Sequence, residues 1–396
     1  MSDSRVQQSD SRGRTWSSPP DGGYGWIIVG SCFTLNAFTW GVTASFGVYL
    51  SEYKRSDEFF NANSVDFGFI GGLNFSCAML LAFPVTYLVR RLGLHPPMII
   101  GCVLQGSGYI GASFASEPWH LYLTQGVLVG SGIGCIIIPS TAILSQWFSN
   151  RRTIANGISS AGSGVGGVAF TWGTAAMIRY QGLNWALRIT GLISLSANIL
   201  ATILLRDRNR DIQPTQLAID VGLLRRTKVW LLLLWAFVSM FGYITLLFSL
   251  SDYALAVGLS STQATDVVGF LNVGTAIGRP IIGLISDHTS KVATAGILTF
   301  VCGVLCFALW LPTTSFGLMV LFAILCGAIL GVFWMTIGPL SAEVEGLRNL
   351  PSLLALAWAA TIIPTACAEF ITLRLAELPA PTTYLYPQIF AANNPV

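Results

Sequence analysis

The chain has 396 residues, of which 53% are hydrophobic and only 10% are charged, and its mean hydropathy is +0.66. Because soluble domains carry about 25% charged residues, this composition excludes an ordinary soluble globule. The formal net charge of +3 is small, and the basic residues fall in short loops rather than on one continuous face, which argues against nucleic-acid binding and leaves membrane lipid as the expected partner surface.

Residues 1–22 form a polar segment that contains Arg5, Arg12 and Arg14 among several Ser and Gln residues. The segment lacks the apolar core of a cleavable signal peptide. Because it has few apolar side chains to bury, we expect a disordered cytoplasmic tail.

Eleven long apolar stretches occupy most of the chain after this tail. A hydrocarbon core about 30 Å thick requires about 20 apolar residues of helix, and a segment in lipid has to satisfy its own backbone hydrogen bonds. The expected spans are residues 24–50, 66–89, 97–115, 119–146, 153–177, 184–205, 229–251, 264–286, 292–311, 316–338 and 351–373. The pattern predicts an all-α polytopic membrane protein with eleven complete transmembrane helices.

A charged linker, residues 206–228, divides these spans into two groups. We expect an N-terminal six-helix bundle over residues 23–205 and a C-terminal bundle over residues 229–396. If the N-terminus is cytoplasmic, 15 of the 21 Lys and Arg residues fall on that side of the membrane, as the positive-inside rule requires. The expected location is the plasma membrane, with a cytoplasmic N-terminus.

The end of the chain resembles the start of a twelfth span. Residues 384–391 are largely apolar, but Asn393, Asn394 and Pro395 interrupt the pattern. A run of about twelve residues cannot cross a bilayer. We therefore expect a truncated twelfth helix and an incomplete C-terminal bundle. Our hypothesis for this truncation is a gene model that ends early.

No cofactor, metal site or enzymatic reaction is expected. The eight cysteines fall inside apolar stretches without a C-x-x-C pair or a histidine cluster, and Cys302 and Cys306, on one helix face, are expected to pack. Residues 162–167 read G-x-G-x-x-G, but no β-α-β unit can surround them in a membrane span. The sequence also has no nucleophile elbow or metal-binding helix.

Two segments combine glycines with charged and aromatic residues. Residues 20–26 read PDGGYGW at the entrance to the first span, and residues 147–157 read WFSNRRTIANG before the fifth span. Glycines permit close backbone packing, an acid suits a helix N-terminus, and aromatic rings suit the headgroup level of a bilayer. The residues expected to matter for gating are Asp21, Gly22, Gly23, Trp26, Arg151 and Arg152.

Both segments resemble signatures of the monocarboxylate porter family, a branch of the major facilitator superfamily, and the similarity covers residues 21 to about 390, with the fungal members most similar. The resemblance implies a major facilitator fold with two pseudo-symmetric helical bundles. Gly283, Asp287 and Lys291 resemble the superfamily's loop motif, which implies a cytoplasmic latch that favours the outward-facing state. In the equivalent turn after the second span, Leu88 replaces the acid.

Arg279 lies in the middle of the eighth span. A guanidinium in hydrocarbon costs about 2.5–3.5 kcal/mol, and bidentate hydrogen bonds to a carboxylate offset that cost. The resemblance implies that this arginine contributes to anion recognition, and permanent pairing with a helix carbonyl or with Glu369 is the structural alternative. Glu369 is itself a candidate proton-sensitive group or a solvated side chain. The other expected substrate-binding residues are Asn74, Asn272 and Thr275.

Two departures limit what the resemblance implies. Proton-coupled animal relatives have a lysine where this chain has Ala44 and an acid where it has Thr275. The leading hypothesis is a secondary active transporter of the monocarboxylate porter type that moves a small organic acid or acidic metabolite by alternating access. The alternatives are efflux of a fungal secondary metabolite and, in another class, a nontransporting membrane sensor or interaction protein.

Overall fold

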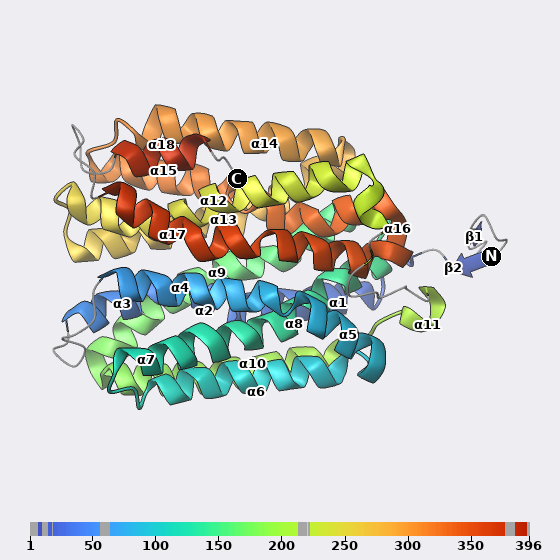
Figure 1. Ribbon diagram of the computed structural model, residues 1–396, viewed down its shortest axis with the longest axis horizontal. Helices are drawn as coiled ribbons and strands as arrows, with labels where there is room; N and C mark the ends of the chain where they lie inside the picture. The colour runs from blue at the N-terminus through green and yellow to red at the C-terminus, as the bar shows by residue number, and fades with distance from the viewer. Residues whose placement is uncertain are drawn as a thin grey trace.

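The computed structural model describes residues 7–9, 15–17, 19–55, 64–212, 220, 222–376 and 385–393. Its helices form two bundles that lie side by side, the N-terminal one blue to green and the C-terminal one yellow to red in Figure 1. A short antiparallel ribbon of β1 (Gln7–Ser9) and β2 (Thr15–Ser17) lies at one end, outside the bundles. The predicted all-α architecture of the apolar region is confirmed.

The helices of the N-terminal bundle coincide with the expected spans. They are α1 (Gly25–Phe38), α2 (Trp40–Ala44), α3 (Phe46–Arg55), α4 (Ser64–Leu80), α5 (Ala82–Leu92), α6 (His95–Ala112), α7 (Pro118–Leu121), the π-helical η2 (Tyr122–Leu128), α8 (Val129–Trp147), α9 (Arg152–Gln181) and α10 (Leu183–Leu204). Breaks at Thr39 and Ser45 divide the first span into α1, α2 and α3. Gly182, with a φ of 83°, makes the one-residue turn from α9 to α10, because glycine adopts positive φ without steric cost.

The second half of the chain contains two helices that meet at a kink within α16. Its helices are α11 (Asn209–Ile212), the 3-10 helix η3 (Leu223–Arg225), α12 (Thr227–Ala256), α13 (Ser261–His288), α14 (Lys291–Leu305), the π-helical η4 (Cys306–Trp310), α15 (Phe316–Ile329), α16 (Val332–Ala360), α17 (Ile362–Ala376) and α18 (Leu385–Asn393). α16 consists of two helices that meet at a kink at Gly346, where the backbone is not helical, with a φ of 73° and a ψ of 170°. The break expected between residues 338 and 351 is therefore present, but it is a kink at one residue rather than a loop.

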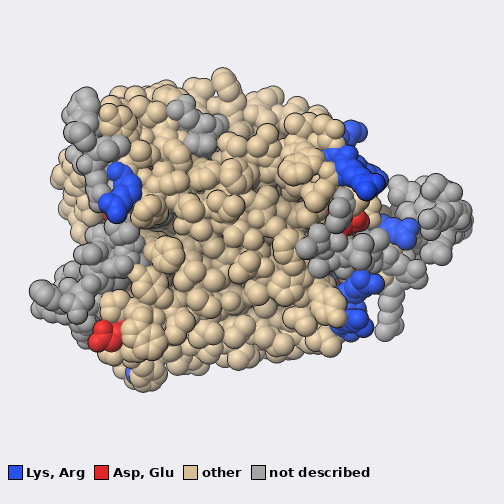
Figure 2. All heavy atoms as spheres, viewed as in Figure 1, with Lys and Arg blue, Asp and Glu red and all other residues tan. Residues whose placement is uncertain are grey.

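The surface of the bundles is suited to lipid. Among the described residues, seven helices are long and apolar enough to cross a membrane, or eight if the bent pair Gly68–Leu80 and Ala82–Leu92 counts as one span. Figure 2 shows a broad belt without charged side chains, with most Lys and Arg at the end that carries α5 and α11. Leu231 is 64% and Phe300 70% exposed, as expected for side chains that face lipid. The chain is a multi-pass membrane protein, and the count of eleven spans plus a truncated twelfth stays a prediction.

The two bundles meet mainly along two helix pairs, α9 with α13 and α4 with α17. Glycines permit the close approach of the first pair. A Cβ at Gly157 would lie 2.6 Å from the carbonyl oxygen of Arg279, and one at Gly164 would lie 2.4 Å from the amide nitrogen of Ala276. Small residues at such contacts bring helix backbones together in membranes. The α9–α13 contact therefore fixes how the two halves face each other, and the predicted domain boundaries stay predictions.

Candidate functional site

Arg279 lies where α13 contacts α9 and is only 5% exposed. Its Nη1 donates hydrogen bonds to the carbonyl oxygen of Ser160 at 2.8 Å and to the Ser163 hydroxyl oxygen at 2.7 Å. A Cβ at Gly331 would lie 2.5 Å from the Arg279 Nη2, so a glycine between α15 and α16 leaves room for the guanidinium. The cation of one bundle therefore binds neutral oxygen atoms of the other.

The charge of Arg279 has no counter-ion among the described residues. No carboxylate in that part of the chain pairs with the guanidinium, and its Nε has no hydrogen-bond partner there. Glu369 belongs to α17, but its side chain lies outside the described residues. Neutral oxygens leave the positive charge uncompensated, and a buried charge in that state favours an anionic partner.

Two cavities border Arg279. The larger one has a volume of about 550 Å³ and extends along α9 to Asn156, near the start of that helix. The smaller one has a volume of about 400 Å³ and extends along α13 to Asn272, toward the opposite end of the bundle. The residues that line both cavities are Trp40, Ser163, Tyr243 and Arg279. The guanidinium thus stands between two spaces that lie along the contact of the bundles.

The structure brings together three of the four expected substrate-binding residues. Asn272 and Thr275 line the smaller cavity with Arg279, and the Thr275 hydroxyl lies 3.0 Å from the carbonyl oxygen of Gly327. Asn74 lies elsewhere, because α4 directs it into the N-terminal bundle. There its side-chain nitrogen donates to the carbonyl oxygen of Gln125 at 2.8 Å.

Aromatic side chains from both bundles surround the guanidinium, and sequence reasoning missed them. The larger cavity is lined by Trp40 of α2, Tyr243 of α12, and Trp334 and Trp358 of α16. Tryptophan is enriched at the two membrane interfaces. Trp40 and Trp358 instead fall inside expected spans, and this unusual position is the signal that could have identified them.

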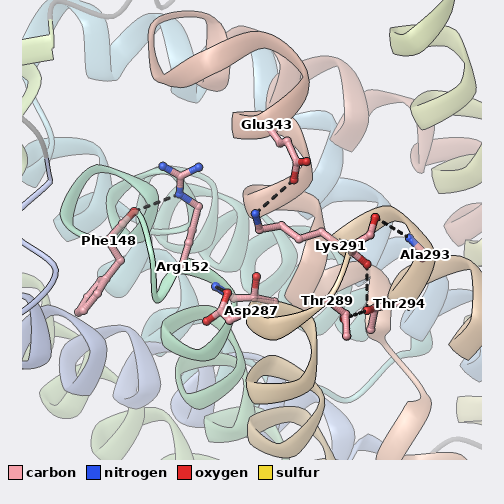
Figure 3. Close-up of polar contacts among 10 residues, drawn as sticks. Phe148, Arg152, Asp287, Thr289, Lys291, Ala293, Thr294 and Glu343 are labelled. Atoms are coloured by element: carbon pink, nitrogen blue, oxygen red, sulfur yellow. Dashed lines mark hydrogen bonds and ion pairs between the residues drawn. The ribbon is translucent and has the colours of Figure 1, made fainter. Parts of the chain in front are cut away.

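A polar contact between α9 and α13 also lies at the start of α9. The Asp287 carboxylate accepts hydrogen bonds from the backbone amides of Thr153 at 2.9 Å and Ile154 at 2.8 Å. These amides belong to the first turn of α9, where unpaired N–H groups and the helix dipole favour a negative charge. Lys291 pairs with Glu343 of α16 at 3.2 Å beside this contact (Figure 3). We call this set of contacts the Asp287 junction, and Gly283 packs within it against Thr153.

The two signature segments contact each other. The Asp21 carboxylate accepts from the backbone amides of Ser149 at 2.6 Å and Asn150 at 3.0 Å, in the loop before α9. It does not cap α1, the helix that it precedes in sequence. Asp21 itself has a φ of 51°, so this corner of the chain has a left-handed backbone.

Glycines and aromatic rings complete this contact of the signatures. Gly22 and Gly23 form the turn into α1, and Gly23 has a φ of 59°. The Trp26 ring, on a residue that is 40% exposed, lies 5.2 Å from the Phe148 ring at an edge-to-face angle of 63°. The first signature thus holds the loop from which α9 starts.

Arg152 lies at the first residue of α9, among acidic side chains. Its Nε donates to the carbonyl oxygen of Phe148 at 3.0 Å (Figure 3). Burial lowers the pKa of this guanidinium, and the negative charges of Asp21, Glu343 and Asp287 oppose that shift. Arg151 precedes it and is exposed. Arg152 therefore sits within the field of these three acids.

The fold and this polar contact between bundles are those of a superfamily of membrane carriers. Residues 29–361 match the Major Facilitator Superfamily, and the chain belongs to that superfamily. The predicted major facilitator fold is confirmed. Because members of the superfamily move small molecules across membranes, the chain is a multi-pass membrane transporter.

Fungal transporters are similar over most of the chain. The "Probable transporter MCH2" of Saccharomyces cerevisiae is 35% identical over 344 residues, which cover 86% of this chain and 73% of the relative. The "Uncharacterized transporter ESBP6" of the same yeast is 33% identical over 94% of this chain, which spans 57% of that relative. The "Fujikurins efflux protein" of Gibberella fujikuroi is 28% identical over 87% of this chain and 74% of the relative.

Proposed function

We propose that the chain is a secondary active transporter of the monocarboxylate porter type that carries a small organic anion. The observation that supports this most is the buried Arg279 guanidinium, which has only neutral oxygen partners among the described residues and lies where the two bundles meet. An anion would supply the missing negative charge through charge-assisted hydrogen bonds. Arg279 would then be the main substrate-binding residue.

The position of Arg279 suits alternating access. In this mechanism two bundles rock around a site near the midplane of the membrane, so the site faces each side in turn. The larger cavity reaches from Arg279 toward the start of α9, and the smaller one reaches toward the start of α13. A small rearrangement of α9 against α13 would connect the guanidinium to one side and close it from the other.

The direction of transport has two candidate answers. One relative bears the name "Fujikurins efflux protein", which favours export of an acidic metabolite by this chain as well. The excess of Lys and Arg at the end that carries α5 and α11 favours a cytoplasmic location for that end and for the N-terminus. We propose the plasma membrane as the location, and Glu369 as a candidate for proton sensitivity.

The test is flux through the purified full chain in proteoliposomes, with radiolabelled organic anions and protein-free liposomes as the background. Replacing Arg279→Gln should lower the transport efficiency at least about 30-fold, since charge-assisted hydrogen bonds are worth about 2 kcal/mol. Arg279→Lys, which keeps the charge, should retain part of the activity. The matched control is Arg179→Gln, because Arg179 belongs to α9, one of the two helices in contact, but is exposed.

Equal flux through the parent chain and Arg279→Gln, at equal amounts of folded protein, would remove the guanidinium from the mechanism. Loss of flux in the control Arg179→Gln to the same degree would show that the assay reports stability rather than recognition. Both variants are therefore compared by size-exclusion profile and melting temperature before flux is measured.

A further inference from the structure

We infer that the anion is aromatic: a planar monocarboxylate with at least one hydroxyl or keto group, whose ring lies against Trp334 and Trp358 and whose carboxylate binds Arg279. This inference rests on the proposed function and narrows its substrate class. The evidence for it is the larger cavity, in which one wall is aromatic and the other contains most of the polar side chains.

The wall formed by the C-terminal bundle is aromatic. The rings of Trp334 and Trp358 are stacked, with centroids 5.4 Å apart and an interplanar angle of 22°. Tyr243 meets Trp334 edge to face at 5.9 Å, and Trp40 of the other bundle lies 5.4 Å from Trp334. A substrate ring gains more on such a surface than an alkyl group of equal size, because aromatic pairs add a directional attraction to the burial of area.

The N-terminal bundle contributes most of the polar side chains of the lining, beside the apolar Ile137 and Leu144. It contains Asn36 of α1, Ser140 and Thr141 of α8, and Asn156 and Ser159 of α9. The side-chain nitrogens of Asn36 and Asn156 donate to carbonyl oxygens of their own helices at 2.9 and 3.0 Å. Their amide oxygens therefore remain as acceptors, which suits a hydroxyl group on the substrate.

The formal charge of the cavity lining is +1. Arg279 is the one Lys, Arg, Asp or Glu among the lining residues that the structure describes. Three buried donors of that lining, the Nε of Arg279 and the indole Nε1 atoms of Trp334 and Trp358, have no partner in the described part of the chain. Trp358 is 1% exposed. One cation with unpaired donors beside it fits one carboxylate, whereas a dianion would bring a second charge that nothing on these walls neutralises.

The groups that line the cavity agree with this class. Arg279, the two indoles and the two asparagines all line this one cavity. A ligand that engages all of them needs a carboxylate, an aromatic ring and a hydroxyl or keto group.

The test is equilibrium binding of radiolabelled 4-hydroxybenzoate to the purified full chain in detergent, which avoids leakage of the protonated acid through lipid. Unlabelled cyclohexanecarboxylate has the same charge without an aromatic face, and should compete about 2- to 10-fold less well than benzoate. Unlabelled 4-hydroxybenzyl alcohol keeps the ring without the charge, and should compete least.

Variants separate the ring contact from the charge contact. Trp358→Leu should weaken 4-hydroxybenzoate binding by about 2- to 10-fold, and Trp358→Phe should keep most of it, because a phenyl face remains. Trp119→Leu is the matched control, since Trp119 lies in α7 and is 56% exposed. Melting temperatures establish that each variant is folded.

The outcomes distinguish this inference from the proposed function. If cyclohexanecarboxylate competes as well as benzoate and Trp358→Leu binds normally, while Arg279→Gln still weakens binding, the aromatic class is wrong and the anion carrier stands. Failure of 4-hydroxybenzoate to bind, with Arg279-dependent flux of an aliphatic acid, would also overturn the aromatic class alone. If the alcohol competes as well as the acid and Arg279→Gln changes nothing, both proposals are wrong.

Discussion

Of the levels at which charged side chains join α9 and α13, two differ in how fully the charge is satisfied. At the Asp287 junction a carboxylate accepts two backbone amides at the positive end of α9. At the centre the Arg279 guanidinium donates to two neutral oxygens and keeps an unpaired Nε among the described residues. The satisfied level holds the bundles together, whereas the incompletely satisfied level is suited to exchange partners with a substrate.

The two bundles also differ from each other at this end of the molecule. The last turn of α13 supplies Asp287, but α5 has Leu88 at the equivalent position in place of the acid. Leu88 cannot accept amide hydrogen bonds, so the pseudo-symmetric partner of the Asp287 junction is missing. We therefore expect closure at this end to depend on Asp287, and removal of this acid tests that expectation.

The largest effect is expected from Gly157→Leu, which would break both levels at once. A Cβ at this position already lies 2.6 Å from the carbonyl oxygen of Arg279, and the rest of a leucine would force α9 away from α13. Overpacking of this kind costs about 1–3 kcal/mol or more. Transport in proteoliposomes should fall to the protein-free background.

The matched control for that change is Gly173→Leu. Gly173 lies in the same helix, and a Cβ there would meet nothing within 4 Å. Gly173→Leu therefore changes the helix propensity of α9 as Gly157→Leu does, but it introduces no clash. Equal transport through both leucine variants would show that the close approach at Gly157 is not required.

An intermediate effect is expected from Asp287→Asn, which weakens only the satisfied level. Removing the charge of the carboxylate that accepts the two amide hydrogen bonds should cost about 2 kcal/mol, which is about 30-fold in a conformational equilibrium. The start of α9 should open more often, and Cys32, which lines the larger cavity, should react faster with an impermeant maleimide added from the Asp287 side. Peptide mass spectrometry measures the rate.

Asp266→Asn is the control for this experiment. Asp266 lies near the other end of α13, where it accepts a hydrogen bond from the Trp172 indole at 3.3 Å. Weakening that end should leave the Cys32 rate unchanged or lower it. A Cys32 rate in Asp287→Asn equal to that of the parent chain would contradict the role of the Asp287 junction as a closure.

The smallest effect is expected from Lys291→Gln. The Lys291–Glu343 pair has a partly exposed partner, since the Glu343 side chain is 52% exposed. Pairs of this type are worth about 0.2–1 kcal/mol, so the Cys32 rate should rise by less than about fivefold. Glu343→Gln and the double variant should give the same small change, because each removes the same pair. A change as large as that of Asp287→Asn would mean that the ion pair, not the carboxylate cap, carries closure.

Much of the fold could be predicted from the sequence, because hydropathy is a local property. A run of about 20 apolar residues becomes a helix in lipid regardless of its neighbours. The kink at Gly346, where two helices meet within α16, could not be predicted in this way, because the polar stretch around it indicated a longer loop. Of the candidate site, Arg279 was found because a mid-span guanidinium is costly, and Asp287 because of its motif.

The remaining site residues depend on how the helices are rotated. Asn74 and Asn272 look alike in sequence, but α4 turns Asn74 toward Gln125 in its own bundle, while α13 turns Asn272 toward the cavity beside Arg279. The aromatic wall combines residues from helices far apart in the chain, so no sequence window contains it.

The sequence by itself determined that this chain crosses a membrane as a bundle of helices, that it carries one cation deep within a span, and that it resembles a known class of carriers. These follow from solvation energies that act on each segment separately, and from motifs that lie within short stretches of the chain. Only the tertiary structure decided which side chains share the Arg279 cavity, because packing between the two bundles sets helix rotation and the direction of every interior side chain.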